Sequence, residues 1–207
     1  MNNYREIVEF SHLPWLKLDI EVPHEAMLEE AINIQQYYVA HRSEESVIGL
    51  SHKGWSSTCI HGIEWNKTNH YTSYGYESND STPYKWTIIS DLCPTITKFF
   101  KYSFPMTEYY RLRIMKLEAR GFIMPHKDME ENRLSPINIS LNQPKECIFK
   151  MRDKGVVPFS PGDAYLLDVG NEHAVINNSN EDRYHIIVHG IPNKDYKELV
   201  IKSYAKK

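Results

Sequence analysis

One pair of residues in the second half of the chain has the types and spacing for metal chemistry. His126 and Asp128 stand two positions apart in the segment MPHKDMEENR, residues 124–133. In an extended segment the side chains of residues i and i+2 lie on the same face, so both can reach one metal ion. A surface ion pair is the simpler alternative. A metal site needs a third ligand further along the chain.

A candidate for that ligand lies in GDAYLLDVGNEHAVINNSNEDRYHIIVHG, residues 162–190. There His173 follows a predicted strand and a short turn, and Arg183 comes ten residues later. Two histidines and one carboxylate with open coordination positions form the facial triad of non-haem Fe(II) oxygenases. Arginine adds a fork of donors that grips a carboxylate at two points. The pattern therefore predicts a metal at His126, Asp128 and His173, with Arg183 beside it for a dicarboxylate.

Ten histidines provide further candidates. Four lie in polar or predicted helical segments and are expected at the surface: His12, His24, His41 and His70. His52 and His61 flank Trp55 in a stretch that resembles a loop, and either a site or a surface position fits them. His185 and His189 share the predicted strand face of Arg183, where they would be donors beside the site or histidines of the core.

The elements that must position these residues begin near residue 105, where the pattern changes to period two. YYRLRIMKLEA alternates, with Arg111, Arg113, Met115 and Leu117 on one face. Four more short β-rich runs follow, separated by turn residues: SPINISLN, ECIFKM, DAYLLDV and RYHIIVHG. Several short strands with no helices between them are typical of an antiparallel sandwich or jelly roll.

The first half of the chain is expected to be helical and rich in loops. Residues 23–42 predict a helix that begins near Pro23, and Asp91 is expected to cap a second helix through PTITKFFKY. Between them, residues 66–84 are polar and rich in tyrosine. Loops of this length are usually either mobile insertions or functional segments such as lids.

Together these patterns predict one α+β domain spanning residues 1–207. Residues 1–104 would supply helices packed against the strands, residues 105–192 the jelly-roll catalytic core, and residues 193–207 a C-terminal tail.

Two predicted strand faces carry an arginine among apolar residues. Arg113 shares its face with Met115, and Arg183 shares its face with Ile187. An arginine on a core-facing stripe is costly unless an anion pairs with it. Two such arginines near one metal suit an enzyme that binds a dicarboxylate cosubstrate and a carboxylate-bearing substrate. The alternative is internal pairing with Asp168 or Glu118.

These residues together resemble the aspartyl/asparaginyl β-hydroxylase family of 2-oxoglutarate-dependent oxygenases, and within it the bacterial cis-4-proline hydroxylase type. The matching features are the Pro-His-x-Asp segment, the Gly-Asp-x-x-x-Leu-Asp strand before His173, and the Asn-x-Ser turn before Arg183. The resemblance covers about residues 105–192. It implies a double-stranded β-helix, a cupin-like jelly roll, with the N-terminal helices packed against it.

The resemblance also implies roles for single residues. His126, Asp128 and His173 would bind Fe(II), and Arg183 would pair with the distal carboxylate of 2-oxoglutarate. Relatives often carry a basic residue where this chain has Asn138, which can hydrogen-bond a carboxylate but cannot neutralise it. The implied enzyme is a dioxygenase that uses Fe(II), 2-oxoglutarate and O2, with ascorbate as reductant in vitro. It would convert 2-oxoglutarate to succinate and CO2 and hydroxylate an unactivated C–H bond.

The substrate is left open by the sequence, because a free amino acid, a peptidyl side chain and a small carboxylic acid all fit. Aromatic walls with one arginine would suit an amino acid. The candidates are Trp55, Trp65, Tyr71, Tyr74 and Tyr76, together with Arg113. Residues 66–82 are expected to be open without substrate and to close over the metal with it. The alternative is an insertion on the opposite face of the barrel.

Two other functions compete with the hydroxylase. One is a cupin-like metal-dependent isomerase that uses the same triad without 2-oxoglutarate, and the other is a non-catalytic small-molecule-binding module. Arg183 argues against the isomerase, which needs no dicarboxylate fork there. The presence of both Asp128 and His173 argues against the binding module. The sequence contains no Gly-x-Ser-x-Gly motif and no Gly-rich phosphate loop.

Composition restricts the remaining functional classes. The 207 residues are 41% hydrophobic and 25% charged, an ordinary globular balance. A net charge of −3 favours neither nucleic acid nor an anionic membrane as partner. The start of the chain does not resemble a secretory signal, and no stretch is apolar enough to span a bilayer. Three widely spaced cysteines do not suggest a disulfide framework, so a cytoplasmic protein is expected.

Overall fold

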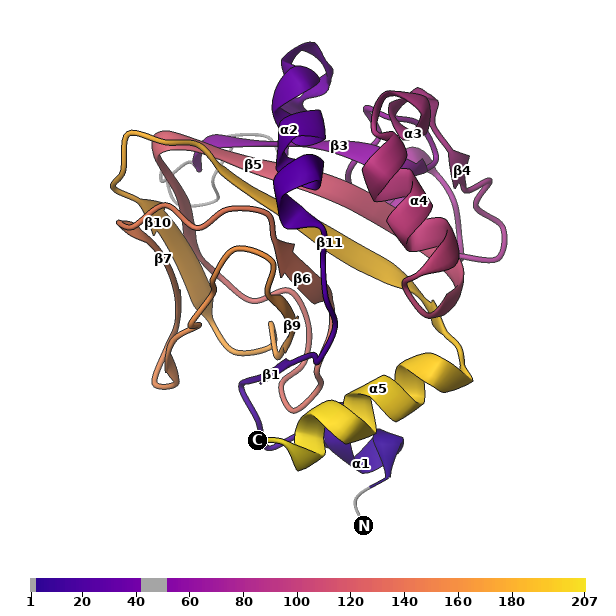
Figure 1. Ribbon diagram of the computed structural model, residues 1–207, viewed down its shortest axis with the longest axis vertical. Coiled ribbons are helices and arrows are strands. Elements are labelled where there is room, and N and C mark those ends of the chain that lie inside the picture. Colours follow the sequence, from indigo (N-terminus) through magenta and orange to yellow (C-terminus); the bar gives the residue numbers. More distant parts are fainter. Residues whose placement is uncertain (1–2, 42–51) are drawn as a thin grey trace.

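The computed structural model describes residues 3–41 and 52–207, and its centre is a curled, mostly antiparallel sheet (Figure 1). The strands of the described residues are β1 (Trp15–Lys17), β2 (Val39–Ala40), β3 (Lys53–Gly62), β4 (Lys85–Trp86), β5 (Met106–His126), β6 (Ile137–Ser140), β7 (Cys147–Met151), β8 (Gly155–Val156), β9 (Ala164–Leu167), β10 (His173–Asn177) and β11 (Arg183–Pro192). Their order is β1-β9-β6-β11-β5-β10-β7-β8, and β3 joins β5 to β2 and β4.

The curled sheet folds into two layers, and strand β5 runs through both. Its first part pairs with β11, where Ile114 lies opposite Ile186, and its end pairs with β10, where His126 lies opposite His173. Between them the chain bends at Arg120, which has a φ of 61°. The next residue is Gly121, where a Cβ atom would lie 2.7 Å from the carbonyl oxygen of Lys53. The glycine permits this close approach, so β5 can turn from one layer into the other.

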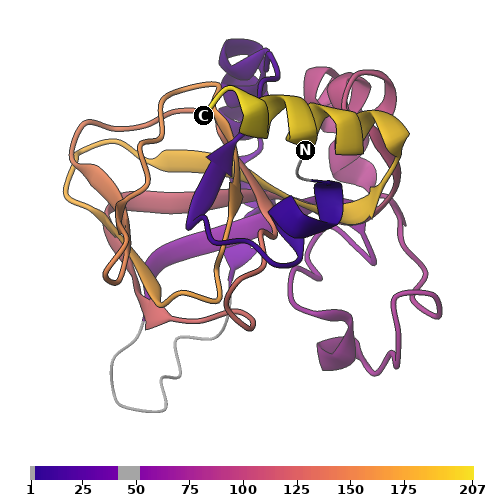
Figure 2. The same cartoon turned by 90° about the horizontal axis from the view of Figure 1, so that it is seen from below.

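The curled layers form a double-stranded β-helix, as predicted, with the strands wrapped around one centre and α5 lying outside them (Figure 2). The helices of the described residues are α1 (Tyr4–Val8), α2 (His24–Asn33), α3 (Ile88–Leu92), α4 (Pro94–Tyr102) and α5 (Lys194–Ala205), with 3-10 turns at Gln35–Tyr37 and Tyr71–Tyr74. None of these helices is long and apolar enough to cross a membrane.

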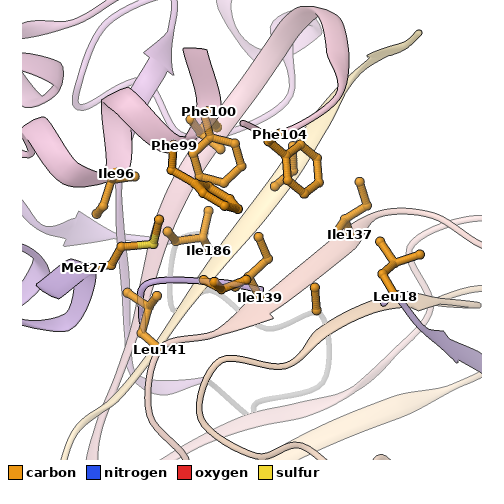
Figure 3. Packing of buried hydrophobic residues seen from close by; sticks show 14 of the residues in the cluster. Leu18, Met27, Ile96, Phe99, Phe100, Phe104, Ile137, Ile139, Leu141 and Ile186 are labelled. Carbon is orange, nitrogen blue, oxygen red and sulfur yellow. The ribbon is translucent and has the colours of Figure 1, made fainter. Parts of the chain in front are cut away.

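The main hydrophobic core lies between the helices and the outer face of the sheet. Met27 of α2 and Phe100 of α4 pack with Ile139 of β6 and Ile186 of β11 (Figure 3). Full burial of such a side chain stabilises the fold by roughly 1.5–3 kcal/mol. Since residues alternate along a strand, the neighbours of these outward residues point into the barrel. Because the apolar residues of β6 and β11 pack on one face, the polar residues of the same strands point to the opposite face.

Helices α2 and α4 differ from the predicted boundaries. The helix expected over residues 23–42 ends at Asn33, and a 3-10 turn and strand β2 follow it. Residue 42 lies outside the described residues. Asp91 does not cap α4 but lies inside the short helix α3, and α4 begins at Pro94. Proline suits the first helical position because its missing N–H would have no intrahelical partner there.

Two parts of the chain that were expected to lie outside the strand core contribute to the fold. Residues 193–207, predicted as a tail, form helix α5, which is capped by Asn193 and buries Tyr196 and Val200. From the first half of the chain, β1 pairs with β9 and β3 pairs with β5. The sheet is therefore built from both halves of the sequence.

Candidate active site

The three predicted metal ligands converge at the end of β5. His126 and His173 are cross-strand neighbours, and Asp128 follows β5 in the loop that leaves it. The Nε2 atom of His126 lies 3.6 Å from one carboxylate oxygen of Asp128, and that of His173 lies 3.8 Å from the other. One ligand atom from each residue fits within a mutual distance of 4.8 Å. A single ion can therefore contact all three residues.

The imidazole rings are oriented by the backbone. The Nδ1 atom of His126 lies 2.7 Å from the carbonyl oxygen of Met124, and that of His173 lies 3.0 Å from the carbonyl oxygen of Asn171. Because a carbonyl only accepts, each Nδ1 donates, which leaves the Nε2 lone pair for a metal. The ring of Phe149 stacks on His173 at an interplanar angle of 4°. This donor set fits Fe(II), with both histidines in the required tautomer.

Asp168 ties the Asp128 loop to the strand end beside it. The Asp128 amide donates to the carbonyl oxygen of Val169 over 3.0 Å. The buried Asp168 carboxylate accepts from the amides of Asn132 at 2.8 Å and Gly170 at 3.2 Å. Burial raises the Asp168 pKa, while these backbone donors lower it. The Asp168 carboxylate therefore stabilises the loop that carries Asp128. The alternative in which Asp168 pairs with Arg183 is not supported.

Arg183 lies in the interior of the barrel with no carboxylate contact among the described residues. It is 5% exposed, lies over the ring of Phe159 at 5.8 Å, and its Nη2 donates to His185 Nδ1 at 3.0 Å. Its Nε atom has no hydrogen-bond partner within residues 3–41 and 52–207. Burial lowers the pKa of Arg183 to about 10, so the side chain is still charged at neutral pH. The other proposed partner, Glu118, is 57% exposed and lies 4.0 Å from Lys116.

A cavity of about 690 Å³ connects the metal ligands with Arg183. The predicted residues Asn138, Arg113 and Trp55 also line it. Arg113 donates to the carbonyl oxygen of Thr68 at 2.9 Å. Tyr74, which was also predicted for the site, is not among the described residues that line the cavity. Its hydroxyl oxygen accepts a hydrogen bond from the Asn69 amide at 3.1 Å.

The predicted lid segment, residues 66–82, lies on the cavity side of the barrel. Three of its residues line the cavity: Asn69, His70 and Ser73. This position is the one that a lid requires, whereas an insertion on the opposite face would line no part of the cavity. Closure over the metal stays a prediction.

One wall of the cavity, here called the cationic wall, consists of His70, Arg111, Arg113 and His189. His189 of β11 lies opposite Arg111 of β5, and Arg113 is the next inward residue along β5. Burial lowers the pKa of His189 well below its ordinary value, and Arg113, Arg111 and His70 lower it further. The pKa of His70 is lowered by burial and by the same arginines. Within the described part of the chain, Asp128 is the only acidic residue that lines this cavity.

One histidine was misplaced from the sequence. His41, expected at the surface, is buried, lines the cavity and contacts Ser57 through Nδ1 at 2.8 Å. His70 is exposed, as expected, and also lines the cavity. The loop-like stretch around Trp55 is strand β3, which holds His61. No local signal marks the burial of His41, because it depends on contact with β3, where the His41 amide donates to the carbonyl oxygen of Trp55 at 2.9 Å.

Comparison with known proteins identifies the family. The family model for aspartyl/asparaginyl β-hydroxylase matches residues 19–191. The chain belongs to this family. It is an oxidoreductase of the hydroxylase-like 2-oxoglutarate/Fe(II) oxygenase class, and the family and the His-Asp-His site together imply Fe(II) and 2-oxoglutarate. The match begins well before the residues that carry the resemblance in sequence, in keeping with the strands that the first half contributes.

Solved structures share the fold at low sequence identity. A prolyl hydroxylase from Trichoplax adhaerens, in complex with a hypoxia inducible factor oxygen degradation domain peptide fragment, is 11% identical at a TM-score of 0.52, over 93% of this chain and 89% of that chain. A 2OG-Fe(II) oxygenase family protein from Burkholderia pseudomallei is 13% identical at a TM-score of 0.51, over 92% of each chain. No curated protein sequence matches.

Proposed function

We propose that this enzyme hydroxylates an unactivated C–H bond of an amino acid, a peptidyl side chain or a related small carboxylic acid. The observation that carries the proposal is one cavity that holds both the three-ligand cluster and a charged arginine with no carboxylate contact among the described residues. A metal ion and a dicarboxylate are the two ligands that these groups suit.

His126, Asp128 and His173 would hold Fe(II), and Arg183 would receive the distal carboxylate of 2-oxoglutarate. Asn138 lines the same cavity from β6, opposite Ile187 of β11, and would offer its amide as a second hydrogen-bond partner. With O2, the bound metal and cosubstrate supply the oxidising chemistry. The residues of the chain orient the cosubstrate, keep the target C–H bond close to the metal and exclude bulk water.

The cationic wall supports a substrate that carries a carboxylate. Arg111 and Arg113 place positive charge in a cavity whose one acidic residue among those described, Asp128, belongs to the metal cluster. Arg113 would pair with the substrate carboxylate, because a guanidinium presents a fork of donors that suits a carboxylate, while Trp55 supplies an aromatic wall beside it. A direct contact between Tyr74 and the substrate stays a prediction that depends on closure of residues 66–82.

A substrate screen tests the proposal directly. Purified protein is incubated with Fe(II), ascorbate and 2-oxoglutarate, and succinate release is measured with each of the twenty amino acids and with a set of small carboxylic acids and peptides. Stimulated release with a hydroxylated product identifies the substrate class. Metal binding without any 2-oxoglutarate turnover would favour the isomerase or the binding module instead. A cytoplasmic location also stays a prediction.

A further inference from the structure

Next to Arg183 lies a histidine that has no role in the site described so far. His185 is 1% exposed, stands two residues beyond Arg183 on the same face of β11, and lines the cavity. Its Nδ1 lies 3.0 Å from Nη2 of Arg183. A guanidinium only donates, so Nδ1 must accept, and the proton of the neutral ring is on Nε2.

The surroundings of His185 hold the imidazole in place without adding charge. The ring of Phe159 contacts His185 edge-on at a centroid distance of 4.7 Å and also lies beneath the Arg183 guanidinium. Burial lowers the pKa of His185 well below its ordinary value, and the charge of Arg183 lowers it further, so the ring is neutral at physiological pH. Phe159, His185 and Arg183 together carry a single positive charge.

Stability of the fold does not explain a histidine at this position. The Nε2 atom of His185 is buried and has no hydrogen-bond partner among the described residues. A buried donor left unpaired destabilises the folded protein, because it gives up its hydrogen bond to water without replacement. An apolar residue of similar size would avoid this cost, whereas it would also remove the acceptor that orients Arg183.

We propose that His185 is a positioning residue for 2-oxoglutarate, which fixes the Arg183 guanidinium without neutralising it. The inference rests on the proposed role of Arg183. An aspartate or glutamate could orient the guanidinium equally well, but it would occupy the charge that the distal carboxylate needs. A neutral acceptor fixes the direction of the fork and leaves its charge for the cosubstrate.

Three substitutions separate orientation from charge. His185→Gln keeps a neutral acceptor, His185→Leu removes the acceptor, and His185→Glu supplies an anionic one. Binding is measured calorimetrically with Mn(II) in place of Fe(II), which allows binding without turnover. We expect the dissociation constant of 2-oxoglutarate to rise less than about threefold for Gln, roughly tenfold for Leu and on the order of a hundredfold or more for Glu.

The same titrations with 2-oxovalerate, which lacks the distal carboxylate, show whether the effect acts through Arg183. We expect the variants to bind 2-oxovalerate as the unaltered protein does. His61→Leu is the matched control, because His61 is also buried, has an Nδ1 with no partner in the described part of the chain, and does not line the cavity. It should leave 2-oxoglutarate binding unchanged.

The possible results distinguish failure of the role proposed for His185 from failure of the role proposed for Arg183, on which it rests. Equal losses for 2-oxoglutarate and 2-oxovalerate, or tighter 2-oxoglutarate binding by the Glu variant than by the Leu variant, would overturn the role of His185. If Arg183→Leu weakens 2-oxoglutarate binding and no His185 variant does, Arg183 keeps its role and His185 loses the one proposed here. If the unaltered protein binds both oxoacids equally, the role of Arg183 falls, and that of His185 with it.

Discussion

On the metal side of the cavity, His126 and His173 each donate Nδ1 to a backbone carbonyl, and the Asp128 amide donates to Val169. On the cationic wall, by contrast, burial and the neighbouring arginines lower the pKa values of His70 and His189. The first side is arranged so that its lone pairs and carboxylate oxygens meet at one point. The second side presents the guanidinium groups of Arg111 and Arg113 to the cavity.

This difference indicates what each side needs from its ligand. The metal side is oriented by hydrogen bonds within the protein, so its geometry is established before any ligand binds. The cationic wall presents two guanidinium groups to the cavity, and a guanidinium forms charge-assisted pairs of hydrogen bonds with a carboxylate. We therefore expect the metal side to decide whether the enzyme works and the wall to decide which substrate it accepts.

The largest effect is expected from the metal side. His126→Ala removes one of three ligands, so turnover should be lost and Mn(II) affinity should fall steeply, with the melting temperature little changed. The reason is that the fold depends on strand pairing and a hydrophobic core, not on the metal. Calorimetric Mn(II) titration, succinate release and thermal unfolding monitored by circular dichroism measure the three quantities.

The surface variant His12→Ala serves as its control and should change none of these quantities. Unfolding of the His126→Ala protein would instead assign a structural role to the metal, and the contrast between the two sides would disappear.

Next in size is Arg183→Ala. Loss of a charge-assisted pair of hydrogen bonds at a buried site costs on the order of 2–5 kcal/mol, so the apparent affinity for 2-oxoglutarate should fall tenfold or more. Arg183→Lys should recover only part of it, because an ammonium group cannot reproduce the planar fork. Mn(II) affinity should stay within about twofold. Unaltered dependence of succinate release on 2-oxoglutarate concentration would refute the assignment.

A smaller and more selective effect is expected on the cationic wall. The double variant Arg111→Gln, Arg113→Gln removes two positive charges from the wall, so the KM for a carboxylate-bearing substrate should rise by roughly tenfold, or about 1.4 kcal/mol. The KM for 2-oxoglutarate should hardly change, and part of its consumption should become uncoupled from product formation. Product and succinate are quantified in the same reaction. An equal rise in both KM values would show that the two sides do not act separately.

The smallest effect on the site is expected from His61, which lies outside both walls and packs against Trp86 and Tyr109. Burial lowers the pKa of His61 from 6.5 to about 4. As pH falls from 6.5 toward 4, the unfolded chain therefore takes up a proton that the folded protein does not. The free energy of unfolding should decrease over this window by up to about 3 kcal/mol through this residue.

His61→Phe should reduce that slope, since other buried histidines contribute the remainder, and should leave 2-oxoglutarate binding intact. Urea unfolding at a series of pH values measures the slope. A slope that matches that of the unaltered protein would show that the His61 pKa is not lowered.

Local patterns in the sequence were sufficient for β5, β6, β7, β9 and β11 and for the spacing of His126 and Asp128, because period-two alternation follows directly from the pleat of a strand. They did not predict the short strands β8 and β10. They were insufficient for β3, whose Gly and Ser residues have little strand preference of their own and which forms by pairing with β5. Helix α5 was missed for a related reason. Its buried residues are few, and contacts with other elements, such as α1 and β1, cover them.

The sequence by itself determined which side chains could bind a metal and a dicarboxylate, since ligand chemistry belongs to residue types and the i, i+2 spacing is local. Only the tertiary structure decided that His41 is buried and that His189 faces Arg111. Burial and cross-strand neighbours depend on register between segments far apart in the chain. The charge and hydrogen-bond environment of each site residue is a product of that register.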